Sequence, residues 1–256
     1  MEPPFSKPDF SRYARLTYSR FRELAQDKRL SPFEKIGFPD QLRASFEQRI
    51  FEDICSKLSV LRASGQTVVD IGSGCGGLPQ LLANHCLARD HRLILIDSPE
   101  MLALIPDVSG VIKMPGRFPR DFNIIPPELE SGADAVLVYS VLQHIMLEDN
   151  VFAFVDAASA LLKPGGMLLL GDIPNASKRA RFLQSEAGIA FHKKYMDTDE
   201  PPATDSLRLE IGAIDDAVVA ALVARARSAG FEAYILPQSS LLPFANRRED
   251  ILISRH

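Results

Sequence analysis

The sequence of 256 residues lacks the features that mark several large protein classes. Its three cysteines, Cys55, Cys75 and Cys86, form no CxxC pair, so neither a disulfide framework nor a zinc site is indicated and we expect no metal. No stretch reaches about 18 apolar residues, which predicts that no segment spans a membrane. Residues 1–16 hold prolines and charges where a signal peptide needs an apolar core, so we expect a cytoplasmic location.

A strong basic bias is also absent. Lys and Arg together number 29 against 33 Asp and Glu, which gives a net charge of −4. Proteins that bind nucleic acids usually carry a strong positive bias, so we expect no nucleic-acid partner. The sequence has no internal repeat and no low-complexity tract. With 46% hydrophobic residues, it can bury a substantial core as a single domain with additions.

From residue 66 onward, short apolar runs alternate with stretches of helical pattern. The runs are TVVDI (67–71), RLILID (92–97), GVIKM (110–114), ADAVLVY (133–139) and GMLLLGDI (166–173). Their apolarity is continuous rather than alternating, which predicts strands buried on both faces and a parallel sheet with crossover helices. FEAYILP (231–237) and DILISRH (250–256) add two strands, after a helix over 217–229 that Asp215 caps and Gly230 ends. The expected fold class is α/β.

The part of the chain before this pattern is expected to be helical. One apolar stripe at helix spacing follows a cap at Ser11, and another follows Asp40, while the stretch SPFEKIGFPD between them predicts a loop. We expect residues 1–62 to form an N-terminal helical extension or lid and residues 63–256 to form the main domain. The segment of about 176–211 is longer than a compact domain needs for a connection, so we interpret it as a partly helical lid insertion.

The stretch VVDIGSGCGG, residues 68–77, ends a strand in an acid and a run of glycines. No Lys follows the glycines, which excludes the phosphate loop GxxxxGK[ST]. A dinucleotide GxGxxG frame can be drawn only through Gly72, Gly74 and Gly77, which is a weak match. Asp70 is more informative, because a dinucleotide site has no general need for an acid there. A cofactor with a cationic amino group does need one.

Four stretches in order resemble one family. VVDIGSGCGG resembles motif I (DxGxGxG) of the class I S-adenosylmethionine-dependent methyltransferases, and RLILIDSPEML resembles their second strand, which ends in an acid. ADAVLVYSVLQHI resembles motif IV, and LLKPGGMLLLGDIPN resembles the helix–PGG–strand segment that follows. The resemblance implies a Rossmann-like, doubly wound, seven-stranded sheet that is mostly parallel with an antiparallel last strand. It also implies S-adenosylmethionine as cofactor and S-adenosylhomocysteine as product.

Within that family, SKPDFSRY near the start and PxANRREDILI near the end resemble uncharacterised bacterial methyltransferases associated with surface-glycan genes. This likeness points to a small-molecule acceptor, an anionic sugar or a nucleotide-linked sugar.

The resemblance also implies which residues contact the cofactor. Glycines 72 and 74 would let the backbone approach its methionine portion, Asp70 would accept from its ammonium group, and Asp97 would accept from the ribose hydroxyls. Arg117 falls where the family often has an acid for the adenine amino group, so backbone groups nearby would replace that contact. The full set of expected cofactor residues is Asp70, Gly72, Ser73, Gly74, Gly76, Asp97, Ser98, Met101, Gly116, Arg117, Phe118, Tyr139 and Ser140.

His144 is the candidate catalytic base, because its reference pKa lies near neutral pH. The alternative is a structural or cofactor-contacting histidine. The surrounding YSVLQH is neither the [DN]PP[YF] tetrapeptide of many methylases of nucleic-acid bases nor a Pro-Cys nucleophile site, so both classes are disfavoured. Asp172 follows the fifth strand and is a metal ligand, a base or a structural acid. No second acid at a suitable spacing supports the metal.

Basic residues far apart in sequence are expected at the same edge of the sheet. Arg179 lies just past the fifth strand, and Arg247 and Arg248 precede the last one. Together with Asp172 they are the expected acceptor-binding residues, and they indicate an anionic acceptor because guanidinium groups suit phosphate oxygens. The alternative is that these arginines are ordinary solvated residues. The basic, aromatic start of the chain is expected to fold over the site, to form an ordinary helix or to mediate a homodimer.

Three other functions compete with methyl transfer. The chain could be a NAD-type oxidoreductase, which the acid in motif I argues against. It could be a binding module that keeps the S-adenosylmethionine fold without catalysis. It could also transfer an aminopropyl group, although that reaction would call for acidic residues around motif IV, where this chain has YSVLQH.

Overall fold

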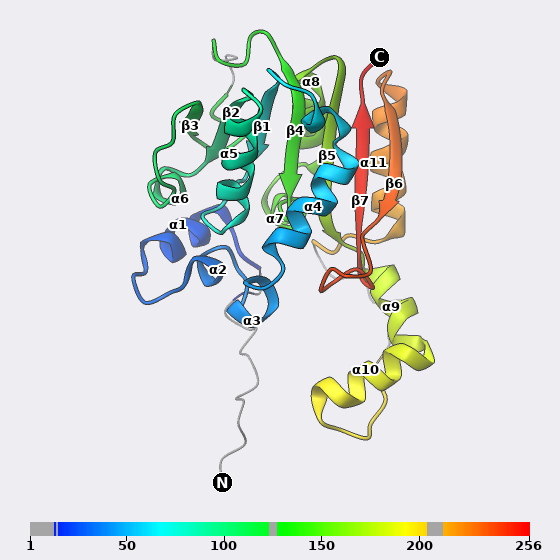
Figure 1. Ribbon diagram of the computed structural model, residues 1–256. Coiled ribbons are helices and arrows are strands. Elements are labelled where there is room, and N and C mark those ends of the chain that lie inside the picture. Colours follow the sequence, from blue (N-terminus) through cyan, green and yellow to red (C-terminus); the bar gives the residue numbers. More distant parts are fainter. Residues whose placement is uncertain (1–12, 14, 123–126, 204–211) are drawn as a thin grey trace.

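One seven-stranded sheet organises the molecule (Figure 1), in the order β3-β2-β1-β4-β5-β7-β6. The computed structural model describes residues 13, 15–122, 127–203 and 212–256. The first five strands are mutually parallel, and β7 is antiparallel to both of its neighbours. This arrangement confirms the expected doubly wound sheet with an antiparallel last strand. The strands are β1 (Thr67–Ile71), β2 (Arg92–Asp97), β3 (Val111–Pro115), β4 (Ala133–Tyr139), β5 (Leu162–Pro174), β6 (Glu232–Pro237) and β7 (Arg248–Ser254).

Helices connect the strands and extend the chain before and after them. The α-helices in the described residues are α1 (Tyr18–Gln26), α2 (Pro32–Lys35), α3 (Asp40–Arg43), α4 (Glu47–Lys57), α5 (Leu78–Ala88), α6 (Pro99–Leu102), α7 (Leu142–Glu148), α8 (Val151–Ala160), α9 (Ala176–Gln184), α10 (Glu186–Met196) and α11 (Asp216–Ser228). A short 3₁₀ turn, η2 (Ser59–Arg62), leads from α4 into β1.

Both faces of the sheet are covered, which explains why its strands are continuous apolar runs. Val68 of β1 packs in one core with Ile54 of α4 and residues of α5. The next residue, Val69, packs in the opposite core with Phe154 of α8 and Leu222 of α11. All five residues of β1 are buried. Because α4 shares a core with the sheet, the N-terminal region is packed against the main domain, while its division at residue 62 stays a prediction.

The N-terminal elements differ in detail from the expected helices. Ser11 lies outside the described residues, and α1 begins instead after Thr17, whose side chain accepts from the backbone N–H of Arg20. The stretch predicted as a loop contains α2, which starts with a capping box: Ser31 accepts from the N–H of Glu34, and Glu34 accepts from the N–H of Ser31. The stripe after Asp40 is broken between α3 and α4.

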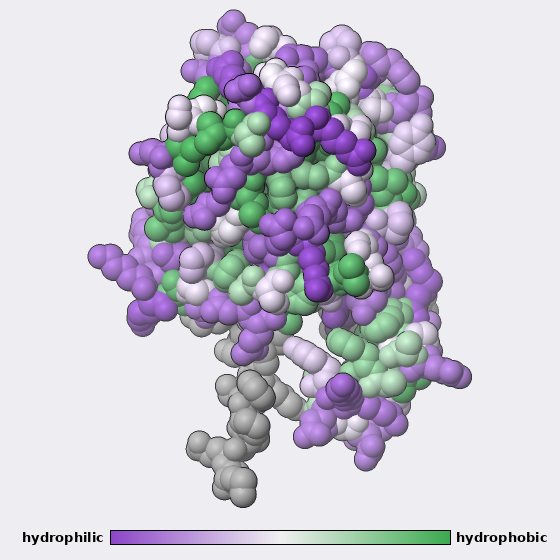
Figure 2. Space-filling view, viewed as in Figure 1, coloured by the Kyte–Doolittle hydropathy of each residue, from purple (hydrophilic) through white to green (hydrophobic). Residues whose placement is uncertain are grey.

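The carboxyl ends of the parallel strands point toward one end of the molecule. Helices α1, α2 and α3 lie across that end, and α9 and α10 extend from it beside β5 (Figure 1). The expected insertion is therefore helical over α9 and α10, while residues 204–211 lie outside the described part. Its function as a lid stays a prediction. Figure 2 shows apolar residues gathered over this projecting part, where Phe191, Tyr195 and Met196 of α10 are each about two-fifths exposed. Among the described residues, no helix is long and apolar enough to cross a membrane.

Candidate active site

A pocket opens at the carboxyl ends of β1, β2 and β4, where ligands bind in open α/β sheets. Its floor is the glycine loop after β1, and its outer wall comes from the N-terminal elements. All the expected cofactor residues except Ser98 line it, and so does His144. The structure thus brings these expected residues together from four separate stretches of the chain. The lining residues that the sequence analysis did not single out include Tyr18, Phe21, Ile36, Phe38, Arg43 and Glu148.

Backbone conformation and close contacts explain why the loop after β1 needs glycine at positions 72 and 74. Gly72 and Gly74 have positive φ angles of 76° and 63°, a conformation that side chains disfavour. A Cβ atom on Gly72 would lie 2.6 Å from a methyl of Val141, and one on Gly74 would lie 2.7 Å from a methyl of Ile36. The loop is therefore held tightly between the chain after β4 and the end of α2.

Asp70, near the end of β1, is a buried acid with an unpaired carboxylate oxygen. The residue is 2% exposed, and its Oδ2 atom accepts no hydrogen bond from any described residue. Burial, reinforced by the nearby carboxylate of Asp97, raises the pKa of Asp70 to about 8. A buried acceptor of this kind favours a cationic donor in the pocket, because such a donor would satisfy the oxygen and stabilise its charge.

Asp97 ends β2 and organises the loop beside it. Its Oδ2 atom accepts from the N–H of Gly74 at 2.8 Å, and its Oδ1 atom accepts from the N–H of Ser98 at 2.6 Å. Burial raises the pKa of Asp97, although these two hydrogen bonds oppose the shift. Ser98 is 1% exposed, and its hydroxyl accepts from the N–H of Met101 as the cap of α6. Ser98 therefore contributes to the wall indirectly.

The far end of the pocket is apolar with one paired cation. The guanidinium of Arg117 forms ion pairs with Asp149 and, at 3.5 Å, with Glu148, and it lies 5.3 Å from the centre of the Tyr18 ring. The backbone N–H groups expected to face an adenine are partly occupied. The N–H of Gly116 donates to the carbonyl of Asp97, and that of Arg117 donates to the carboxylate of Asp121.

His144 has both ring nitrogens engaged. Its Nδ1 atom lies 3.0 Å from the carbonyl oxygen of Leu16, and its Nε2 atom lies 3.2 Å from the side-chain nitrogen of Gln143. A carbonyl only accepts and an amide nitrogen only donates, so the proton is on Nδ1 and the Nε2 lone pair is taken. Burial lowers the pKa of His144 to about 4. Of the two roles left open by the sequence, this geometry favours the structural one, in which His144 fastens the segment before α1.

Arg43 and Glu47 are functional candidates that the sequence analysis missed. Arg43 is 4% exposed and lines the pocket, and its Nε donates to Glu47 at 2.9 Å. Its guanidinium carbon lies 5.0 Å from the centre of the Phe38 ring and 5.5 Å from that of Tyr139. Their i, i+4 spacing was the only sequence signal, and many surface ion pairs share it.

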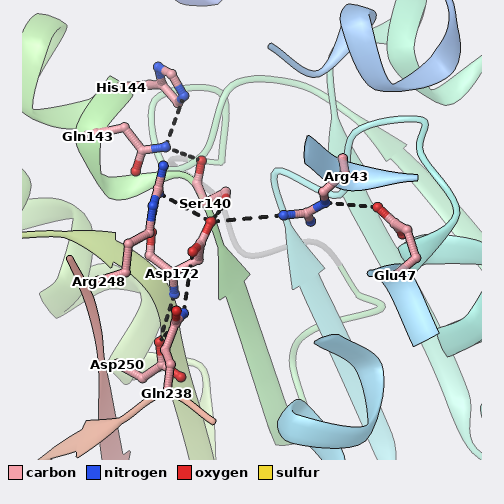
Figure 3. A network of polar contacts seen from close by, with 9 residues as sticks. All are labelled: Arg43, Glu47, Ser140, Gln143, His144, Asp172, Gln238, Arg248 and Asp250. Carbon is pink, nitrogen blue, oxygen red and sulfur yellow. Dashed lines mark hydrogen bonds and ion pairs between the residues drawn. The ribbon is translucent and has the colours of Figure 1, made fainter. Parts of the chain in front are cut away.

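Behind the pocket, Asp172 is the centre of a buried polar network (Figure 3). The Ser140 hydroxyl donates to its carboxylate, and Arg248 donates to the same oxygen at 3.2 Å. Gln238 donates to the other carboxylate oxygen at 3.3 Å. Ser140 and Asp172 both have positive φ angles, 60° and 58°, which cost roughly 1–3 kcal/mol each in residues other than glycine. Only Ser140 of this pair lines the pocket, so Asp172 is connected to it through that hydroxyl.

The expected acceptor arginines form a cluster next to the pocket rather than in it. Arg248 lies 6.0 Å from the ring centre of Phe38, which is part of the pocket wall, and Arg247 lies 5.1 Å from that of Phe244. Burial lowers the pKa of Arg247, and the nearby charges of Arg179 and Arg248 lower it further. In the described part of the chain, Arg247 has no acidic partner; its Nε donates only to the side chain of Asn246.

Metal ligands are not gathered anywhere in the described ranges, where no group of three or more His, Cys, Asp or Glu side chains could hold a metal ion. All three cysteines are free thiols, and Cys75 and Cys86 are buried.

Comparison with known proteins identifies the domain. Residues 69–170 match a family model described as "Methyltransferase domain". A curated relative, chondramide synthase cmdD from Chondromyces crocatus, is 33% identical over 121 residues, which are 45% of this chain; the chain spans only about 3% of that relative's length.

Solved structures show the same fold at low identity. The plantazolicin methyltransferase BamL, in complex with a triazolic desmethylPZN analog and SAH, aligns with a TM-score of 0.57 at 13% identity, covering 94% of this chain and all of BamL (100%). The N-methyltransferase NodS from Bradyrhizobium japonicum WM9, in complex with S-adenosyl-l-homocysteine, aligns with a TM-score of 0.52 at 16% identity, covering 92% of this chain and 95% of NodS.

Proposed function

We propose that this protein methylates a small, anionic molecule with S-adenosylmethionine, because residues 69–170 match a methyltransferase model and the sheet has the strand order of the class I fold. The observation that carries the proposal is the pocket at the carboxyl ends of β1, β2 and β4. It combines an unpartnered buried acid, a tight glycine loop and a second acid at the end of the neighbouring strand.

The residues present fit the cofactor. The unpaired Oδ2 atom of Asp70 suits an ammonium group, which supplies the donor that this buried oxygen lacks. Asp97 uses one hydrogen bond on each carboxylate oxygen, and each oxygen keeps a lone pair for a ribose hydroxyl. Met101 and Phe118 offer apolar surface to the adenine. We assign cofactor contacts to the remaining expected residues that line the pocket, and not to Ser98.

When bound, S-adenosylmethionine supplies an electrophilic methyl group on a sulfonium. The task of the chain is then to align a nucleophile with that carbon and to exclude water. The N-terminal elements close the outer side of the pocket, where Tyr18, Phe21 and Phe38 present aromatic surface. His144 fastens the Leu16 carbonyl there, and we assign it this positioning role.

The arginine cluster supports an anionic acceptor. Arg247 is a partly buried cation without an acidic partner in the described part of the chain, and two more arginines lie close to it. Leaving such a charge unpaired is costly, and a phosphate or carboxylate of the acceptor would compensate it. Arg248 connects this cluster to Asp172 and the pocket wall, so the anionic group would lie outward from the methylated atom. A phosphorylated or nucleotide-linked sugar has this form.

An acceptor hydroxyl must also lose a proton. Ser140 lines the pocket and donates its own hydroxyl proton to Asp172, so its oxygen can accept from the acceptor. A proton from the acceptor hydroxyl would then pass to Ser140 while the Ser140 proton passes to Asp172, whose carboxyl would become neutral.

A methyl-transfer assay tests the proposal. The purified protein is incubated with S-adenosylmethionine and a panel that pairs uncharged sugars with their phosphorylated and nucleotide-linked counterparts, and products carrying an added methyl group are detected by mass spectrometry. We expect methylation of charged members only. Arg247→Met should then raise the KM for the best acceptor by roughly 10- to 100-fold.

The control is Arg92→Met, an exposed arginine at the opposite end of the sheet, which should leave KM unchanged. Methylation of the uncharged sugars with equal efficiency, or an Arg247→Met enzyme with unaltered KM, would contradict the anionic acceptor.

A further inference from the structure

Arg43 is a buried, ion-paired cation of the pocket with unused hydrogen-bond donors. It is 4% exposed, and its only hydrogen bond in the described part of the chain is the one from Nε to Glu47. The nearest other acid is Asp172, 3.9 Å from one terminal nitrogen. A guanidinium has five N–H donors, so four have no hydrogen-bond acceptor among the described residues. Because Arg43 lines the pocket, these donors are available to a ligand bound there.

The position of Arg43 shows where that acceptor would lie. The guanidinium contacts the ring of Tyr139, the last residue of β4, and both residues line the pocket. Strand β4 pairs directly with β1, whose residue Asp70 is in register with Leu137, two residues before Tyr139. The unpaired oxygen of Asp70 near the end of β1 and the guanidinium of Arg43, which α3 places beside the end of β4, therefore lie at neighbouring strand ends.

A carboxylate oxygen without a partner and a guanidinium with free terminal donors are together complementary to a zwitterion. The α-amino acid group of the cofactor carries an ammonium and a carboxylate on one carbon. We infer that Arg43 is the residue that binds the carboxylate of the cofactor's amino-acid end, with Glu47 as its positioning residue. This inference rests on the proposed function, since it names a further contact to the same cofactor.

Glu47 and the aromatic rings explain how Arg43 is held. Glu47 accepts from Nε, which leaves the two terminal nitrogens as a fork suited to a carboxylate. The Glu47 carboxylate itself lies at the start of α5: a Cβ atom on Gly77 would be 3.2 Å from its Oε2 atom. That oxygen accepts no hydrogen bond in the described part of the chain, so Glu47 does not cap α5. Its contact with Nε leaves the terminal nitrogens of Arg43 available to the cofactor's carboxylate.

Two ligands that differ only in the carboxylate test its contribution to binding. S-adenosylmethionine carries the ammonium and the carboxylate, whereas decarboxylated S-adenosylmethionine carries the ammonium alone. Isothermal calorimetry on the full chain should show that the wild type prefers the carboxylated ligand. Arg43→Met should weaken binding of S-adenosylmethionine by roughly 10- to 100-fold and change binding of the decarboxylated ligand by less than about threefold.

Further variants make the result specific. Asp70→Asn should weaken both ligands, because both carry the ammonium. Arg49→Met, an exposed arginine of α4, should change neither. Arg43→Lys keeps the positive charge and replaces Arg43→Met if that variant does not fold. It should lose part of the preference for S-adenosylmethionine over the decarboxylated ligand, since an ammonium cannot form the two parallel hydrogen bonds of a guanidinium.

An Arg43 variant that is folded and weakens both ligands equally would overturn the inference and leave Arg43 as a packing residue. Wild-type protein that binds neither ligand would instead overturn the proposed function.

Discussion

At the scale of single residues, the site is defined by buried charged side chains with unused hydrogen-bonding capacity. Asp70 could be identified from the sequence because it lies just before the glycines at the end of an apolar run. Arg43 could not, since its burial depends on α3 folding across the strand ends and on the ring of Tyr139, which is distant in sequence. Local sequence does not distinguish such an arginine from a solvated one. The same limit applied to His144, whose partner Leu16 is 128 positions away.

Asp70 gives a prediction about stability and pH in the ligand-free protein. Its pKa is about 8 in the folded state against a usual value of 3.8, so between these values the folded carboxyl keeps a proton that the unfolded chain has lost. The folded state therefore binds more protons, and this group makes stability fall as pH rises from about 4 to about 8. Asp70→Asn removes the ionisation. The melting temperature of this variant should match that of the wild type near pH 4, and it should exceed the wild-type value by a growing margin as the pH rises to about 8.

Thermal unfolding of both proteins across that pH range measures the difference directly. A gap between the two melting temperatures that stays constant with pH would show that Asp70 does not titrate as its burial requires.

At the scale of elements, the sequence predicted the central strands best. The bounds of β1, β2 and β4 agree with the apolar runs, because strands covered on both faces leave a continuous signal. Strand β5 begins earlier, at Leu162, since Leu162 pairs with Ala133 across a register shift. The helix α2 was missed although Ser31 and Glu34 form a recognisable capping box, because proline and glycine nearby indicated a loop.

Contact between α2 and the glycine loop predicts a coupled pair of substitutions. Gly74→Ala places a methyl group 2.7 Å from Ile36 in a left-handed conformation, so it should lower the free energy of unfolding by roughly 2–4 kcal/mol. Ile36→Ala removes the obstructing methyl. In the double variant the steric part disappears and only the backbone strain remains, which predicts a favourable coupling of about 1 kcal/mol or more.

Denaturant unfolding of the wild type, both single variants and the double variant gives this coupling. If the double variant loses the sum of the two single variants' losses in unfolding free energy, to within about 0.5 kcal/mol, Ile36 does not restrict the loop.

At the scale of the whole molecule, one end of the sheet carries all the proposed chemistry. The N-terminal helices wall the proposed cofactor pocket. Arg179 belongs to α9 and Arg248 begins β7, and these two elements meet at the same end of the sheet (Figure 1). Although the chain has a net charge of −4, Arg179, Arg247 and Arg248 come together from two distant segments. The sequence predicted this gathering from the antiparallel last strand, whose start lies at the carboxyl ends of the others. The aromatic partners of these arginines could not be predicted, since they depend on how the loops fold over that end.

The most direct test of the account is calorimetric binding of S-adenosylhomocysteine to the wild type and to Asp97→Ala, with circular dichroism to verify that both are folded. We predict binding in the micromolar range at one site per chain, weakened at least ~30-fold by the substitution, because Asp97 both accepts from the ligand and holds Gly74 in place. Folded wild-type protein that binds no S-adenosylhomocysteine would contradict the assignment of the pocket.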